Sequence, residues 1–151
     1  MTAEEQLEMF LARFDPKIVA HAQGAREKLQ KRLPGAVELV YDNYQALVVG
    51  YGPDDNSSHA PFSIAIYPGW INLFFLIGAR LADPTGCLKG AGSTVRHIRL
   101  SDLALLDTPV IEGHIASSLA IRPIPPTQPR RLVIKAIAPN QRPRRPTGAR
   151  K

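Results

Sequence analysis

Between residues 37 and 100, apolar residues alternate with other residues along several short runs, and turn residues separate these runs. A period of two matches the β-strand, in which successive side chains point to opposite faces of a sheet. Short connections between successive strands favour antiparallel pairing. The pattern therefore predicts an antiparallel sheet of about five strands, at residues 37–41, 45–51, 62–67, 70–77 and 94–100.

The fourth of these runs, Trp70 to Ile77, is the most continuously apolar stretch of the chain. Strands that are apolar on both faces are typical of the covered centre of a sheet. We therefore expect this strand to lie centrally with both faces covered. The run is far shorter than the roughly 20 apolar residues that a membrane-spanning helix needs, so we expect no membrane span.

Helical patterns flank the strands on both sides. Apolar residues at helical spacing predict a first helix over residues 3–14. Asp15 and Pro16 are typical of the start of a second helix, and Thr108 and Pro109 repeat that pattern before the last helix. The order of N-terminal helices, strands and a C-terminal helix predicts an α+β domain with helices packed on one face of the sheet.

The net charge of +6 is unevenly distributed along the chain. Residues 1–121 carry ten Lys and Arg against thirteen Asp and Glu, whereas residues 122–151 carry nine basic residues, no acidic residue and seven of the fourteen prolines. Proline and like charges both oppose compaction. We predict a domain over residues 1–122 and a flexible basic tail over residues 123–151, largely extended or disordered, whose apolar island either docks as a short strand or stays loose.

The tail offers cations without competing carboxylates, which suits nonspecific contact with phosphates. Nucleic acid or another anionic surface is therefore one candidate partner, and a tail that is only solvated is the alternative. The cations that would make these contacts are Arg130, Arg131, Lys135, Arg142, Arg144 and Arg145.

The chain has a single cysteine, Cys87, so it forms no internal disulfide and a reducing compartment, the cytoplasm, is expected. The acidic N-terminus does not have the pattern of a secretory signal. A lone thiol in a loop beside Lys89 is interpreted as incidental. The four histidines, His21, His59, His97 and His114, show no close metal-ligand spacing. Two of them, His21 and His114, lie on expected helices, and we expect them at the surface or at the edge of the core.

A glycine turn followed by a cationic strand is the candidate ligand site. Two glycines free the backbone amides to turn toward an anion, although Lys89 precedes the first glycine, unlike the lysine of a P-loop. Alternation along the strand directs Arg96 away from His97 and Arg99. A plain turn feeding a solvated strand is the alternative. The candidate ligand-binding residues are Lys89, Gly90, Gly92, Arg96, His97 and Arg99, with Trp70 on the adjacent aromatic sheet.

Three motifs follow one another between residues 78 and 100: the stretch GARLADP, the turn LKGAG and the strand VRHIRL. Together with tail segments 134–137 and 141–146, they resemble the signature block of the YdhG-like domain of unknown function. The resemblance covers residues 15–121 and the tail. It implies an α+β domain comparable to frataxin, and some relatives carry the description of intracellular iron chaperone.

A frataxin-like function implies iron, and hard iron prefers oxygen ligands such as exposed carboxylates. The carboxylates available are Glu4, Glu5 and Glu8 in the first helix and Asp54 and Asp55 in a loop. The leading prediction is a small, cytoplasmic, non-enzymatic binding module for a small anion or a protein partner. Iron delivery and nucleic-acid binding through the tail are the alternatives, and no catalytic residue is predicted.

Overall fold

The computed structural model describes residues 1–146 and combines helices with a mixed six-stranded sheet, which confirms the α+β class. The strands, in the spatial order β5-β4-β3-β2-β1-β6, are β1 (Val37–Asp42), β2 (Leu47–Gly52), β3 (Phe62–Ile66), β4 (Ile71–Phe75), β5 (Arg96–Arg99) and β6 (Arg131–Ile137). The α-helices are α1 (Ala3–Leu11), α2 (Pro16–Arg32) and α3 (Pro109–Ile121), and short 3-10 helices are η1 (Ser57–His59), η2 (Gly78–Arg80) and η3 (Leu103–Asp107). Within residues 1–146 no helix has the length and apolar character to cross a membrane.

Two helices, α2 and α3, begin at the residues that the sequence predicts as their starts. The Asp15 carboxylate accepts a hydrogen bond from the backbone N–H of Lys17 at 3.0 Å, and Pro16 fills the first position of α2, as predicted. Thr108 also occupies the N-cap position of α3, but its hydroxyl donates to the Leu105 carbonyl at 2.7 Å instead of capping the helix. Sequence therefore identifies both helix starts, and only the first of these two caps forms.

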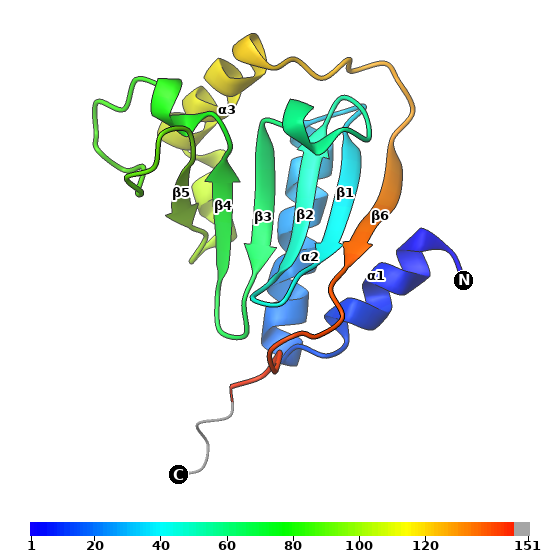
Figure 1. Ribbon diagram of the computed structural model, residues 1–151. Helices are drawn as coiled ribbons and strands as arrows, with labels where there is room; N and C mark the ends of the chain where they lie inside the picture. The colour runs from blue at the N-terminus through cyan, green and yellow to red at the C-terminus, as the bar shows by residue number, and fades with distance from the viewer. Residues whose placement is uncertain (147–151) are drawn as a thin grey trace.

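The core lies between the helices and one face of the sheet. Strands β1 to β5 form an antiparallel meander, and their register aligns one row of buried residues across it, Val40, Val49, Ile64, Leu73 and Ile98. Figure 1 shows α2 and α3 on this face, behind the sheet. Fully burying a side chain of this kind contributes about 1.5–3 kcal/mol, so this layer supplies much of the stability.

Strand β4 differs from its prediction. It lies between β3 and β5, one strand from the edge of the sheet, and only one of its faces is fully buried. Ile71, Leu73 and Phe75 are buried, whereas Asn72 and Phe74 on the opposite face are half-buried. The apolar run looked continuous because Trp70 and residues 76–77 were counted with the strand, although they lie outside it.

The sheet has six strands rather than five, because the apolar island of the tail forms β6. This strand pairs in parallel with β1, with Arg131 beside Val37. Leu132 and Ile134 pack against the core next to α1, and a bulge in the register leaves Lys135 exposed without a partner on β1. The docked part of the tail continues beyond β6, since the backbone N–H of Arg142 donates to the Tyr44 carbonyl at 3.0 Å. The last predicted tail residues, 147–151, lie outside the described part of the chain.

A buried ion pair holds the segment after β6 on the domain. The Arg144 side chain is 4% exposed, and its Nη2 lies 2.7 Å from Oδ1 of Asp42, which is 1% exposed. The same guanidinium donates to the backbone carbonyls of Asn43 and Tyr44 and lies over the ring of Phe14. A residue of the predicted flexible tail is therefore part of the interior.

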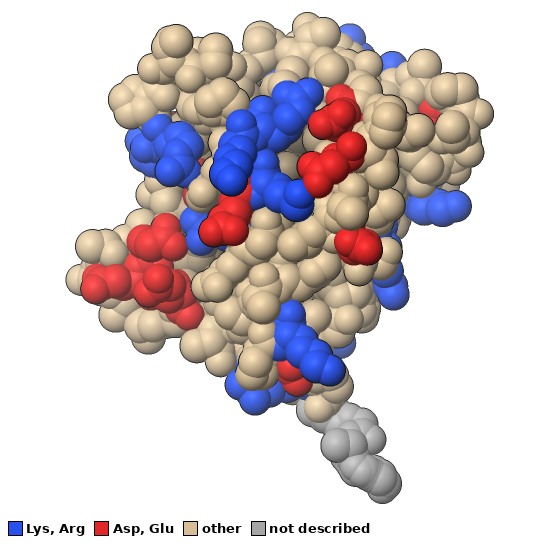
Figure 2. All heavy atoms as spheres, turned by 180° about the vertical axis from the view of Figure 1, so that it is seen from behind, with Lys and Arg blue, Asp and Glu red and all other residues tan. Residues whose placement is uncertain are grey.

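Charges of opposite sign adjoin on the helical face. Figure 2 shows Lys and Arg near the centre of this face with Asp and Glu on both sides, and a separate acidic group at the left, where α1 lies. The net charge of the chain therefore does not translate into one continuous basic surface on this side.

Gly35 in the turn before β1 cannot accept a side chain. Its φ is +83°, and a Cβ at this position would collide with the backbone carbonyl of Pro125. We expect Gly35→Ala to lower the free energy of unfolding by more than about 1 kcal/mol, measured by urea denaturation. Gly113→Ala is the matched control, because a Cβ there meets nothing within 4 Å on helix α3. That variant is expected to stabilise the protein by up to about 1 kcal/mol. Equal changes in the free energy of unfolding at both positions would show that the backbone conformation of Gly35 is not what excludes a side chain.

Candidate functional site

A cavity of about 450 Å³ lies at the outer edge of β5. The chain beside this edge is held by two backbone hydrogen bonds between Lys89 and His97, at 2.8 and 2.9 Å. Gly90 follows with a φ of +117°, a conformation that favours glycine. The residues lining the cavity are Asn72, Cys87, Lys89, His97, Ile98, Arg99, Leu105 and Ile111. We call this cavity the β5 pocket.

The β5 pocket combines cationic and polar groups with an apolar wall. Lys89, His97 and Arg99 come from two neighbouring segments, and no Asp or Glu is among the described residues that line the cavity. Small-molecule sites typically have about 300–1,000 Å³ and a few convergent polar groups on apolar surroundings. The arrangement therefore has the size and chemistry to bind a small anion.

Aromatic rings hold the two β5 side chains that border the pocket. The His97 ring lies 5.3 Å from the Phe74 ring, and the Arg99 guanidinium lies 5.0 Å from the centre of the Trp70 ring. Trp70 in turn stacks on Tyr67 at 4.7 Å. Arg99 and Trp70 also line a second cavity of about 320 Å³, beside α2. Trp70 therefore contacts the predicted site through Arg99.

Arg96, Gly90 and Gly92 have other roles than lining the β5 pocket. The Arg96 guanidinium donates to the carbonyls of Gly92, at 2.6 Å, and Val95, at 2.8 Å. Its side chain packs against Gly78, where a Cβ would meet Arg96. The structure thus brings together Lys89, His97 and Arg99, whereas Arg96 stabilises the glycine turn through its hydrogen bonds to backbone carbonyls.

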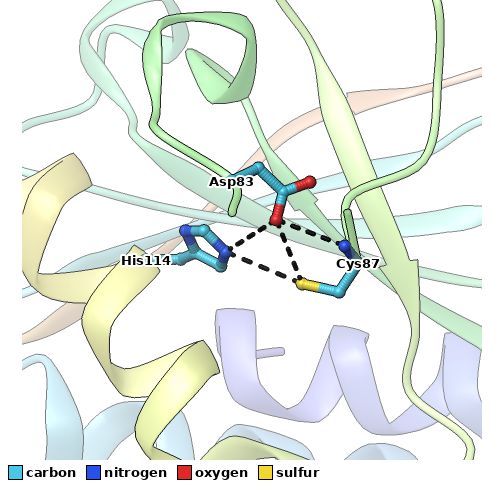
Figure 3. Close-up of side chains that lie close together, drawn as sticks. All are labelled: Asp83, Cys87 and His114. Atoms are coloured by element: carbon cyan, nitrogen blue, oxygen red, sulfur yellow. Dashed lines mark hydrogen bonds and ion pairs between the residues drawn. The ribbon is translucent and has the colours of Figure 1, made fainter. Parts of the chain in front are cut away.

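A second group of polar side chains adjoins the β5 pocket through Cys87. Asp83, Cys87 and His114 converge in Figure 3, with the first two on the loop after η2 and the third on α3. Oδ1 of Asp83 lies 3.5 Å from Sγ of Cys87 and 3.3 Å from Nε2 of His114, and the sulfur lies 3.6 Å from that nitrogen. We call these three residues the DCH cluster. Each provides one atom that can bind a metal ion, and the three atoms lie close enough together to share one ion.

Local structure positions each member of the DCH cluster. The Asp83 carboxylate accepts the backbone N–H groups of Cys87, at 3.2 Å, and Leu88, at 3.0 Å. The hydrogen bond from Leu88, followed by those from the thiol and N–H of Cys87, lowers the pKa of Asp83 below its ordinary value. His114 is 6% exposed on the inner side of α3, and its ring meets the edge of Phe75 at 5.9 Å.

The sequence interpretation missed the DCH cluster. Cys87 was expected to be incidental and His114 to be a surface or core-edge residue, and no metal-ligand spacing linked any histidine to another ligand. His114 is buried beside Cys87, although 27 residues separate the two in the chain. Spacing rules detect ligands that neighbour each other along the chain, so the packing of α3 against the loop was needed to find this group.

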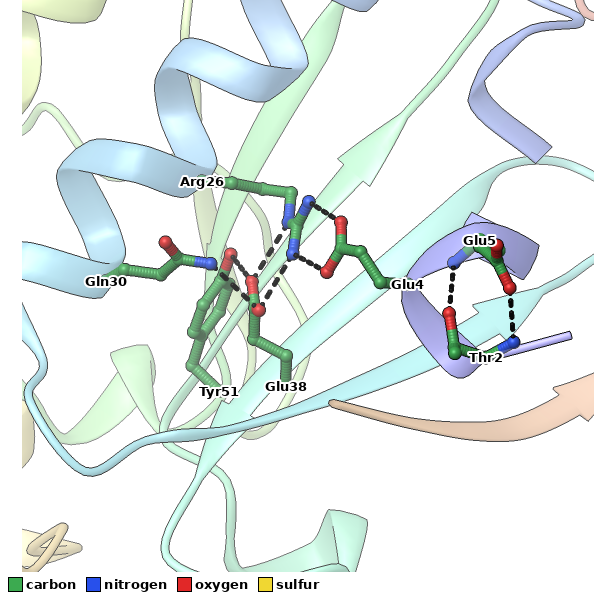
Figure 4. A network of polar contacts seen from close by, with 7 residues as sticks. All are labelled: Thr2, Glu4, Glu5, Arg26, Gln30, Glu38 and Tyr51. Atoms are coloured by element: carbon green, nitrogen blue, oxygen red, sulfur yellow. Dashed lines mark hydrogen bonds and ion pairs between the residues drawn. The ribbon is translucent and has the colours of Figure 1, made fainter. Parts of the chain in front are cut away.

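A polar pocket of about 350 Å³ borders a network of polar side chains beneath α1 and α2. Glu38 is 4% exposed and accepts hydrogen bonds from Arg26, Gln30 and Tyr51 (Figure 4). Burial alone would lower the pKa of Arg26, but its hydrogen bonds to Glu38 and Glu4 outweigh that effect and raise the pKa. Burial, followed by the Glu38 charge, raises the pKa of Tyr51. These groups satisfy one another, so we interpret the network as structural.

The tail cations divide into exposed and engaged side chains. Arg130, Arg131 and Lys135 are exposed at or near β6. Arg142 donates to the side chain of Gln45, Arg145 donates to the carbonyl of Arg13, and Arg144 is buried on Asp42. The carboxylates predicted for iron are partly engaged as well: Glu4 binds Arg26, Glu5 caps α1 at Thr2, and Asp54 contacts His59.

Comparison with protein-family models, curated protein sequences and solved structures finds no match for this chain. The resemblance to YdhG-like domains therefore stays a prediction from the motifs. Within residues 1–146, the β5 pocket and the DCH cluster are the two groups of side chains whose chemistry suits a ligand.

Proposed function

We propose that this protein is a binding module for a small anionic ligand, which it holds in the β5 pocket. The observation that supports the proposal most directly is the meeting of Lys89, His97 and Arg99 at one cavity of about 450 Å³. A ligand with a phosphate or carboxylate group would accept hydrogen bonds from Lys89 and Arg99. Its remaining part would contact Ile98, Leu105 and Ile111.

The expected affinity is set by two exposed cations. Lys89 and Arg99 are both exposed, so solvent screens their charges. Hydrogen bonds to charged groups contribute about 1.5–3 kcal/mol each, and screening places these two at the lower end of that range, which corresponds to roughly 10-fold in affinity. Losing either side chain should therefore weaken binding measurably without affecting the fold.

The test is calorimetric titration of metal-free protein with phosphate, pyrophosphate, citrate and AMP. We expect at least one of these anions to bind, and Arg99→Ala and Lys89→Ala each to weaken that binding by about 10-fold or more. Arg80→Ala is the matched control, because Arg80 is an exposed cation nearby that does not line the β5 pocket. Binding that is unchanged in both pocket variants, or reduced equally in the control, would rule out the proposal.

Nucleic-acid binding through the tail and iron delivery stay predictions of the sequence. For the tail, the exposed cations Arg130, Arg131 and Lys135 support contact with phosphates. Deleting residues 123–151 would not isolate that function, since it would also remove β6 and Arg144. Substituting these three exposed cations would remove their charge while leaving β6 and Arg144 in the chain, so any loss of nucleic-acid binding could be assigned to the charge.

A further inference from the structure

We infer that Asp83, Cys87 and His114 bind a divalent transition-metal ion of the zinc type through one oxygen, one sulfur and one nitrogen. The inference is independent of the anion proposal, although both involve Cys87.

The distances are those of one face of a tetrahedral zinc site. Zinc binds Cys sulfur at about 2.3 Å, His nitrogen at about 2.0–2.1 Å and carboxylate oxygen at about 2.0–2.2 Å. With tetrahedral angles, these bond lengths separate nitrogen from oxygen by about 3.3 Å, sulfur from oxygen by about 3.5 Å and sulfur from nitrogen by about 3.6 Å. The corresponding separations in the DCH cluster are 3.3, 3.5 and 3.6 Å.

Hydrogen bonding alone accounts for the cluster less well. A thiol offers one hydrogen, Nε2 offers at most one, and an ionised carboxylate offers none. Two hydrogens cannot serve all three contacts of the triangle. The distance of 3.3 Å between Nε2 and the carboxylate is also long, because charge-assisted bonds of this type measure about 2.7–2.9 Å. One ion among the three atoms satisfies all of them.

The supporting contacts already hold the ligands in place. The other oxygen of the Asp83 carboxylate, Oδ2, accepts the backbone N–H of Leu88 at 3.0 Å, which leaves Oδ1 directed at the cluster. Packing against Phe75 fixes the His114 ring. Contacts of this kind orient metal ligands and raise affinity, so binding requires little rearrangement beyond loss of the thiol hydrogen to solvent.

The donor set favours zinc over iron. Thiolate and imidazole are softer ligands than the carboxylates that suit hard cations, and together with one carboxylate they match the preferences of Zn²⁺. No fourth His, Cys, Asp or Glu joins the group within residues 1–146. Three protein ligands leave one coordination position for water or an exogenous ligand, and Cys87 connects the ion to the β5 pocket.

Cobalt provides the decisive measurement on the unaltered chain. Co²⁺ in a tetrahedral site with a thiolate ligand has intense visible bands and a sulfur-to-metal charge-transfer band in the near ultraviolet. Because Cys87 is the single cysteine, any such band reports this thiol alone. We expect one Co²⁺ per chain with both spectral features, and stoichiometric bleaching when Zn²⁺ is added. A pale octahedral spectrum without a sulfur band would overturn the inference.

Variants then assign the ligands. Cys87→Ser and His114→Gln should abolish the sulfur band or the tetrahedral spectrum and weaken Zn²⁺ binding by more than about 100-fold, since loss of an outer partner alone typically costs 10- to 100-fold. His59→Gln is the matched control, because His59 and Asp54 form an exposed imidazole–carboxylate contact at 2.9 Å without a thiol. Zn²⁺ affinity unchanged in Cys87→Ser, or Fe²⁺ displacing Zn²⁺ under anaerobic conditions, would refute the assignment. None of these assays contains an added anion, so failure here leaves the β5 pocket untouched.

Discussion

Replacing Glu38 by glutamine is expected to lower the free energy of unfolding by about 3–5 kcal/mol, the cost of breaking a buried ion pair by removing one partner. The Glu38 carboxylate accepts hydrogen bonds from Nε and Nη2 of Arg26, at 3.0 and 2.9 Å, and from the Tyr51 hydroxyl, at 2.8 Å. A glutamine side chain at this position would keep the shape but lose the charge. Arg26, only 8% exposed, would then depend on the exposed Glu4.

Urea denaturation followed by circular dichroism measures this effect. The control is Glu4→Gln, which removes the exposed partner of the same guanidinium and should cost about 1 kcal/mol or less. Whole domains are stable by only about 5–15 kcal/mol, so the Glu38→Gln effect should be visible as a large shift of the midpoint. If the two variants are equally stable, the network does not anchor α1 and α2 to β1.

Arg144→Met is the second substitution with a large expected cost, again about 3–5 kcal/mol. Methionine retains an apolar stem near Phe14 but leaves the Asp42 carboxylate buried without its close partner. The remaining cation, Arg13, lies 3.6 Å from Asp42 and is half exposed. The expected result is a domain that unfolds at lower urea concentration and whose segment after β6 becomes sensitive to protease.

Two comparisons make this result specific. Arg145→Met removes the neighbouring exposed guanidinium, which donates to a backbone carbonyl, and should change stability by less than about 1 kcal/mol. Adding Asp42→Asn to Arg144→Met removes the unpaired charge and should recover part of the loss. A tail that is merely solvated would make both arginine variants indistinguishable from the unaltered protein.

Features that depend on neighbours along the chain were predictable from sequence. The N-cap at Asp15 lies two residues from the N–H that it binds. The five strands of the meander follow from alternation along the chain, because strands that succeed one another in sequence also pair with one another in the sheet. The same alternation separates Arg96 from His97 and Arg99, whose side chains contact different neighbours.

Features that depend on distant parts of the chain were not predictable. Strand β6 lies among prolines and arginines, so the composition around it favours an extended tail. Pairing with β1 and packing of Leu132 and Ile134 against the core stabilise it as a strand. Arg144 and Asp42 are 102 residues apart. The DCH cluster likewise depends on how α3 packs over a loop. Local patterns carry no information about these partners, because the energy that selects them comes from tertiary contacts.

The parallel pairing of β6 with β1 also has a consequence for the order of folding. During synthesis, β1 to β5 precede β6, so one edge of β1 lacks its partner and Asp42 lacks Arg144 until the later segment is made. Contacts between distant segments are formed late because closing long loops costs entropy. The meander of β1 to β5 is therefore incomplete until residues 131–144 pair with the edge of β1 and bring Arg144 to Asp42.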